Sequence, residues 1–200
     1  MTLKNTPTRW GPVSQALHWL IVLMILVQGS VALWMGGLRN GPDKIQVYAL
    51  HKSFGLTILA LVVLRLLWRL YAGHPRAVAG TPAWQHRAAS LAHGALYALL
   101  LAIPLSGWVL NSAAGFPLQW FGLFNLPKLV ATSHDLHEMA EDAHELMFWA
   151  LVSLALLHAF AAVYHHLFQR DDTLARMLPR GWLRSGDPPD PRLPEEPRHG

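Results

Sequence analysis

The sequence has no cysteine among its 200 residues. This absence excludes disulfide bonds, thiolate metal sites and the Cys-x-x-Cys-His attachment of c-type haem, so any haem would have to be held non-covalently. Charged residues are also scarce, at 14% against 52% hydrophobic residues. A soluble domain carries roughly 25% charged residues, so this chain lacks the polar side chains that would cover a water-facing surface. The composition predicts an integral membrane protein.

The remaining charge gives a net value of +4 at pH 7. The basic residues flank apolar runs and form no stripe, so they predict membrane topology and no nucleic-acid partner. Most of them lie before the first apolar run, between the second and third, and after the fourth. On the opposite side, the first connection is mixed (Arg39, Asp43, Lys44) and the second is acidic near the fourth run. By the positive-inside rule, both termini are expected in the cytoplasm.

Four apolar runs reach the length of about 20 residues that a membrane crossing needs. The predicted fold class is all-α, a transmembrane four-helix bundle forming one domain over residues 1–180, with spans at about 18–38, 51–71, 88–111 and 144–169. Lys4 and Arg9 precede the first run as in a signal peptide, but no small-x-small cleavage pattern closes it, so we expect a retained helix. Residues 181–200 are rich in proline and charge and are predicted to form a disordered cytoplasmic tail.

Four of the twelve histidines lie at membrane depth in the predicted spans: His18, His51, His144 and His158. Ionisable groups at that depth are costly and usually face the bundle interior with a defined partner. A single such histidine is most simply explained by a hydrogen bond to a neighbouring helix. Four histidines at matched depths favour a different explanation, in which pairs of them bind a shared cofactor. His134 and His137, which precede the fourth span, fit an exposed helix face better than a weak metal site.

Depth and helical phase arrange the four histidines in two pairs. His144 and His158 are 14 residues apart, close to four turns, so they share a helix face at positions about 21 Å apart. The predicted topology places His51 beside His144 near the outer boundary, and His18 beside His158 toward the cytoplasm. Each pair could hold the iron of one b-type haem between two imidazoles. A structural zinc ion would instead need about four ligands at one point.

Two basic residues of the second span could bind haem propionates. Arg65 follows His51 by 14 residues, so it faces the same way at the depth of the inner haem. Its guanidinium would suit a propionate of that haem, unless it only snorkels to the interface. Lys52 could serve the propionates of the outer haem or only mark the membrane boundary.

Four further residues are candidates for contact with a cofactor. His93 could contact the inner haem or a quinone, or be merely interfacial. His165 follows His158 by two turns and could lie beside the inner propionates or at a water-accessible edge. Gly29 and Gly55 could make room for a macrocycle at the outer level, or only allow the helices to pack closely.

Four stretches of the chain resemble the bacterial cytochrome b561 family, the small four-helix di-haem membrane cytochromes. They are ALHWLIVLMILVQGSVALWMGG, LHKSFGLTILALVVLRLLWRLYAGHP, AHGALYALLLAIPLSGWV and HELMFWALVSLALLHAFAAVYHHLFQRDDTLARMLP, which cover nearly all of residues 14–180 in order. The resemblance implies the same axial ligands, His18, His51, His144 and His158, in a bacterial inner membrane. The histidine-rich approach to the fourth span and the proline-rich tail depart from the family, and His137 could compete with His144 as a ligand.

The resemblance also implies transmembrane electron transfer through the two haems, from a periplasmic one-electron donor such as superoxide to ubiquinone. Bis-histidine ligation leaves no open iron position, so we expect outer-sphere transfer by a membrane oxidoreductase or electron carrier. The expected partners are membrane lipid, ubiquinone and that donor, and a homodimer stays open. A haem b membrane-anchor subunit that relays electrons from a dehydrogenase or hydrogenase to quinone is the alternative. A haem-free metal or proton transporter using the same histidines ranks lower.

Overall fold

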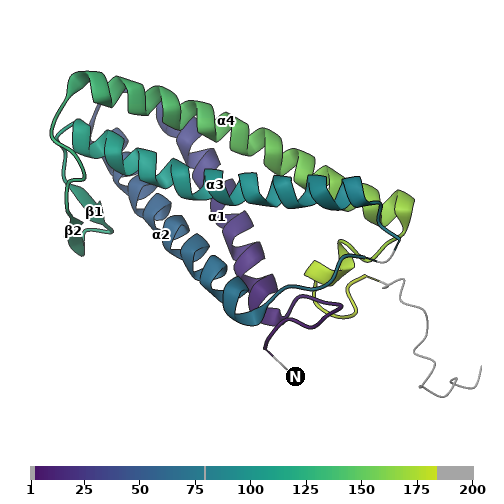
Figure 1. The fold of residues 1–200 in the computed structure, drawn as a ribbon. Coiled ribbons are helices and arrows are strands. Elements are labelled where there is room, and N and C mark those ends of the chain that lie inside the picture. The colour runs from purple at the N-terminus through teal and green to yellow at the C-terminus, as the bar shows by residue number, and fades with distance from the viewer. Residues whose placement is uncertain (1–2, 79, 184–200) are drawn as a thin grey trace, which may run out of the picture.

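The computed structural model describes residues 3–78 and 80–183. It contains four long helices, which are α1 (Pro12–Gly36), α2 (Pro42–Ala72), α3 (Ala83–Ala113) and α4 (His134–Tyr164) (Figure 1). Each of them is long and apolar enough to cross a membrane. The predicted all-α transmembrane bundle is confirmed, and the chain is a multi-pass membrane protein.

The helices alternate in direction, which gives the bundle two distinct ends. At the proximal end α1 and α3 begin and α2 and α4 finish, and at the distal end the reverse holds. The helices extend beyond the predicted apolar spans, most clearly where α2 begins at Pro42 and α4 at His134. The start of α4 is capped, because the Ser133 side chain accepts a hydrogen bond from the Leu136 backbone N–H.

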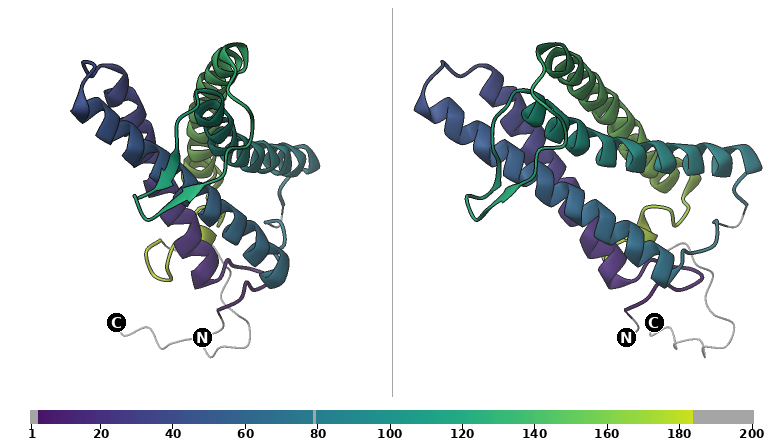
Figure 2. Two further views of the ribbon diagram at one scale, coloured as in Figure 1. Left: turned by 90° about the vertical axis from the view of Figure 1, so that its left-hand side faces the viewer. Right: turned by 60° about the vertical axis from the view of Figure 1, so that its left-hand side comes forward.

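The four helices form two crossed pairs. α1 packs on α2 and α3 packs on α4, while α2 and α3 join the pairs. The pairs are inclined to each other (Figure 2). A small core of Ile21, Ile58 and Val62 lies between α1 and α2, and Val62 has no exposed surface. Many large apolar side chains along the helices face outward instead. Such a distribution suits lipid tails as the surroundings.

A β-hairpin at the distal end was not predicted from the sequence. Its strands β1 (Leu118–Trp120) and β2 (Phe124–Leu126) pair antiparallel. The hairpin is fastened to α2, because the Trp120 indole donates to Thr57 Oγ1 over 3.1 Å and the Phe121 backbone N–H donates to Ser53 Oγ over 3.0 Å. It therefore covers the side of α2 that follows His51.

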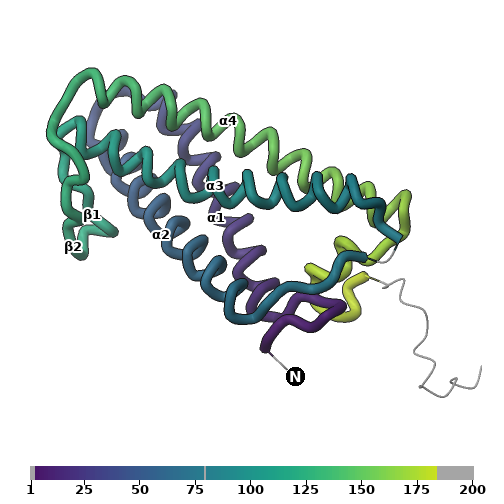
Figure 3. Tube along the Cα trace, viewed as in Figure 1, coloured from purple at the N-terminus to yellow at the C-terminus, as the bar shows by residue number. Residues whose placement is uncertain are grey.

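The proximal end is closed by both ends of the described chain. After α4 the chain makes a π-helical turn (His165–Gln169) and a short 3-10 helix (Ala175–Met177). The Gln15 side chain donates to Leu178 O over 3.0 Å, and the Trp19 indole donates to Met177 O over 2.9 Å. The N-terminal and post-α4 segments accordingly lie side by side in the chain trace (Figure 3). Most of the predicted disordered tail, residues 184–200, lies outside the described residues.

Candidate functional site

The structure brings together the two histidine pairs that depth and phase predict. The ring centroids of His18 and His158 are 6.4 Å apart with an interplanar angle of 83°. Those of His51 and His144 are also 6.4 Å apart, at 72°. One pair belongs to the proximal half of the bundle and the other to the distal half, and each joins α4 to a helix of the other pair. Iron ligation by these residues stays a prediction.

The spacing within each pair fits a metal ion held between two rings. With metal–nitrogen bonds of about 2 Å, two imidazoles that bind one ion from opposite sides have centroids about 6 Å apart. Within residues 3–78 and 80–183, no three or more His, Cys, Asp or Glu side chains are arranged to hold a metal ion by themselves. Each pair offers two imidazoles, which suits a metal that brings further ligands of its own, as iron in porphyrin does.

In the distal pair, His144 is held by residues of α3. Ser106 Oγ lies 2.9 Å from His144 Nδ1 and 2.8 Å from Ile103 O. A Cβ atom added to Gly107 would lie 3.2 Å from His144 Cε1. The edge of the imidazole thus rests directly on the α3 backbone, next to a hydrogen-bonding hydroxyl.

Its partner His51 has different surroundings. The Gln28 side chain of α1 donates to His51 O over 2.7 Å. Within the described part of the chain, His51 Nδ1 and Gln28 Oε1 are buried side-chain atoms that have no hydrogen-bond partner. The backbone of His51 is therefore anchored to α1, whereas its ring receives no comparable polar support.

The predicted glycines of the distal half both face a side chain of a neighbouring helix. A Cβ at Gly29 would lie 3.4 Å from Phe148 Cε2, and a Cβ at Gly55 would lie 3.5 Å from Gln28 Nε2. These are contacts between helices. They leave the predicted role of the two glycines in making room for a macrocycle untested.

The proximal level contains a third imidazole. The centroid of the His93 ring lies 5.2 Å from that of His158, at an interplanar angle of 69°. The positive charge of Arg65 lies near enough to His18, His93 and His158 to interact electrostatically with each of them. Its Nε donates to the Tyr97 hydroxyl and its Nη1 to Ser14 O, each over 3.0 Å. Arg65 therefore joins α1, α2 and α3 at the level of this pair, and its contact with a propionate stays a prediction.

Two other predicted contact residues have protein partners. Lys52 Nζ donates to Asn111 Oδ1 over 3.0 Å, which ties α2 to the distal end of α3. His165 Nδ1 lies 2.6 Å from Asp171 Oδ2. Burial raises the pKa of Asp171, but hydrogen bonds from His165 and Thr173 outweigh it and hold that pKa below its ordinary value. Asp171 is therefore a carboxylate at neutral pH.

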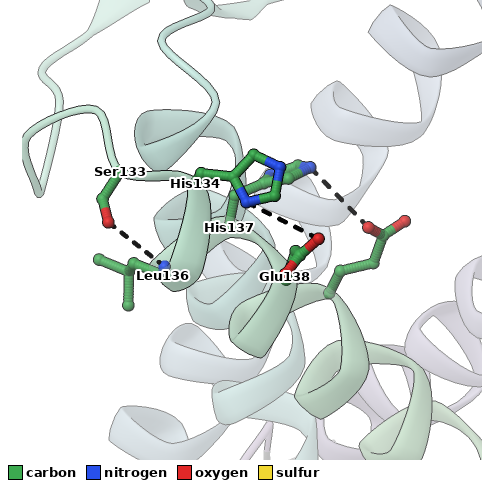
Figure 4. Close-up of polar contacts among 6 residues, drawn as sticks. Ser133, His134, Leu136, His137 and Glu138 are labelled. Atoms are coloured by element: carbon green, nitrogen blue, oxygen red, sulfur yellow. Dashed lines mark hydrogen bonds and ion pairs between the residues drawn. The ribbon is translucent and has the colours of Figure 1, made fainter.

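His134 and His137 form no site with the paired histidines. They lie on the first turns of α4 and face carboxylates one turn on, with Nδ1 of His134 3.7 Å from Glu138 and Nε2 of His137 3.8 Å from Glu141 (Figure 4). His134 is exposed, as expected for a helix face turned to water.

Sequence reasoning missed the side chains that support the histidines, above all Ser106, Gly107, Gln28 and Tyr97. Small and polar residues in an apolar helix ordinarily indicate helix packing. A usable signal was available for the first two, because Ser106 lies seven residues before the distal end of α3 and His144 lies ten residues after the distal start of α4, which gives them similar depths.

The family model described as prokaryotic cytochrome b561 matches residues 9–180. The chain belongs to the prokaryotic cytochrome b561 family. It is similar to cytochrome b561 homolog 2 of Escherichia coli, with 35% identity over 89% of this chain and 95% of the relative. It is also similar to cytochrome b561 homolog 1 of the same organism, with 32% identity over 86% of this chain and 98% of the relative.

A third relative, named a probable superoxide oxidase of Yersinia pestis, is 28% identical over 82% of this chain and 92% of its own length. Membership of the cytochrome b561 family makes the protein a membrane electron-transfer protein and implies b-type haem. The spacing within each of the two histidine pairs suits that cofactor.

Proposed function

We propose that this member of the cytochrome b561 family carries electrons across a bacterial inner membrane through two b-type haems. His18 and His158 would hold one haem, and His51 and His144 the other. The single observation that carries the proposal is that each half of the bundle contains two imidazole rings whose centroids are 6.4 Å apart. Bound haem supplies one-electron redox chemistry, and the protein holds the irons, sets their potentials and excludes side reactions.

The proposed orientation places both termini in the cytoplasm, so the distal end faces the periplasm. The basic connections at the proximal end support it through the positive-inside rule. Two imidazoles on each iron would leave no position open for oxygen. Electrons would therefore pass by outer-sphere transfer, entering near the distal pair and leaving near the proximal pair.

We propose ubiquinone at the proximal end as the acceptor. A cavity of about 160 Å³ lies there, lined by Gln85, His86 and His165 together with Ala77, Val78, Thr81, Ala89 and Thr173. An apolar cavity of about 150 Å³ is large enough for a benzene ring, so this one suits the ring of a quinone headgroup. Reduction of a quinone to a quinol consumes two protons along with two electrons, and the His165–Asp171 pair could supply a proton from the cytoplasmic side.

The donor at the distal end could be superoxide, in keeping with the name of the Yersinia relative. One observation favours a partner protein instead. The first turns of α4 expose five carboxylates beside the distal end: Asp135, Glu138, Glu141, Asp142 and Glu145. A negative surface repels an anion such as superoxide and attracts a basic protein. An anchor subunit that receives electrons from a partner oxidoreductase is therefore the second candidate function.

Haem content tests the core of the proposal. The purified protein, expressed with sufficient haem, should show sharp b-type bands after reduction with dithionite, and two haems per chain. His51→Ala and His144→Ala should each remove one haem, and His18→Ala the other. His134→Ala is the matched control, because that side chain is exposed on α4, and it should keep both haems. Absence of b-type bands in the wild type would refute the proposal.

Salt dependence separates the two donors. If superoxide reduces the protein, raising the ionic strength should speed the reaction, because screening weakens its repulsion by the acidic turns of α4. Reduction by a basic donor protein should slow down instead. Replacing Glu138 and Glu141 by glutamine should weaken the dependence of the reduction rate on ionic strength for either donor. A salt dependence that these changes do not alter would contradict electron entry beside the acidic first turns of α4.

A further inference from the structure

The hydrogen bonds of Ser106 determine where the proton of His144 lies. A hydroxyl has one proton to donate, and a backbone carbonyl can only accept. Ser106 Oγ is 2.8 Å from Ile103 O, so its proton goes to that carbonyl. At 2.9 Å from His144 Nδ1, the same oxygen must then accept from Nδ1–H. The neutral ring therefore leaves Nε2 unprotonated.

Gly107 fixes the position of the same ring from the side. A Cβ there would come within 3.2 Å of His144 Cε1 and 3.5 Å of Nδ1, so any larger residue would push the imidazole away from α3. Gly94 on the same helix differs, because a Cβ there would meet nothing within 4 Å in the described structure. The close approach is therefore a local feature of Gly107.

We propose that Ser106 and Gly107 are positioning residues for His144 that present its Nε2 to the distal haem iron. The inference rests on the proposed function, since His144 must be an axial ligand for it to hold. It adds an asymmetry to the distal site. A partner on the second ring nitrogen makes an imidazole a more basic ligand, and His144 has such a partner, whereas His51 Nδ1 has none within the described residues.

Ser106→Ala tests the hydrogen bond. A less basic ligand stabilises ferric iron less well, so the midpoint potential of the distal haem should rise. The electron paramagnetic resonance signal of one low-spin ferric haem should shift, and that of the other should stay. Ser106→Thr, which keeps the hydroxyl, should have the wild-type midpoint potential and the wild-type resonance signal. Ser90→Ala, an exposed position on the same helix, should change neither. The distal component is assigned from His51→Ala, which should lack it.

Gly107→Ala and Gly94→Ala form the second comparison. The first should lower occupancy of the distal haem or alter its resonance signal, and the second should leave both haems as in the wild type. The inference is overturned if Ser106→Ala has wild-type potentials and signals, or if both haems shift equally. Failure of the proposed function would look different, because the wild type would bind no haem or His144→Ala would keep two.

Discussion

Replacing Arg65 by glutamine tests the electrostatics of the proximal haem site. The Arg65 guanidinium donates to Ser14 O over 3.0 Å. Ser14 precedes His18 by four residues, which is about 6 Å along α1. A full positive charge therefore lies about one helical turn from a proposed axial ligand. Positive charge stabilises the reduced, electron-richer haem, so its removal should lower the midpoint potential of that haem.

The size of the effect follows from Coulomb's law. At a separation of about 10 Å and an effective dielectric constant of about 20, a unit charge contributes about 1.7 kcal/mol. For a one-electron couple, this free energy corresponds to about 70 mV. The proposed distal haem would lie about 21 Å further along α4, by the spacing of His144 and His158. It should shift by less than half as much.

Potentiometric titration of Arg65→Gln, followed in the haem absorption bands, should show one of two components moving down by about 70 mV. Arg65→Lys keeps the charge but replaces the two separate donor nitrogens of the guanidinium by one ammonium, so it should retain most of the wild-type potential. An unchanged proximal potential in Arg65→Gln would refute the placement of this charge beside the proximal site. So would an equal loss in the lysine variant, because the hydrogen bonds and not the charge would then be responsible.

Three further changes have defined outcomes. His158→Ala should keep part of the proximal haem, because the His93 ring is 5.2 Å from the lost imidazole and could replace it. The double variant His158→Ala/His93→Ala should lose that haem. Equal haem content in the single and the double variant, measured by a pyridine haemochrome assay, would contradict this. Asp171→Asn should lower the thermal stability in detergent at pH 7. Because the pKa of Asp171 is depressed, its carboxylate contributes to the stability of the folded protein above about pH 3.8, and this contribution is lost as the pH falls further. The difference in stability between the variant and the wild type should therefore disappear in acid and not at high pH. Val62→Ala should cost about 2 kcal/mol in denaturation by sodium dodecyl sulfate, since the side chain is fully buried, and an unchanged midpoint would argue against this core.

The helices and the histidine pairs could be predicted because both depend on simple periodicities. Apolar runs of spanning length leave little choice of fold in a membrane. The 14-residue interval between His144 and His158 sets both their shared face and their depths. With alternating helix directions, His18 and His51 could each match only one partner.

Contacts between distant side chains could not be predicted in the same way. Ser106 and Gly107 resemble ordinary small residues of a membrane helix, and only the approach of α4 gives them a polar partner. His93 could be placed at the right depth, but its ring contact with His158 depends on how α3 is rotated. The β-hairpin was missed because its strands have three residues each and its turn places Phe121, a non-glycine residue, at a positive φ of 48°.

The bonds from Gln15 and Trp19 to the segment after α4 have a consequence for synthesis of the protein. Gln15 and Leu178 are separated by 163 positions in the chain. Since a ribosome produces the chain from its N-terminus, the first helix enters the bilayer long before its final backbone partners exist. The proximal end is therefore assembled last, and the side of the bundle next to His18 stays uncovered until translation has passed Leu178.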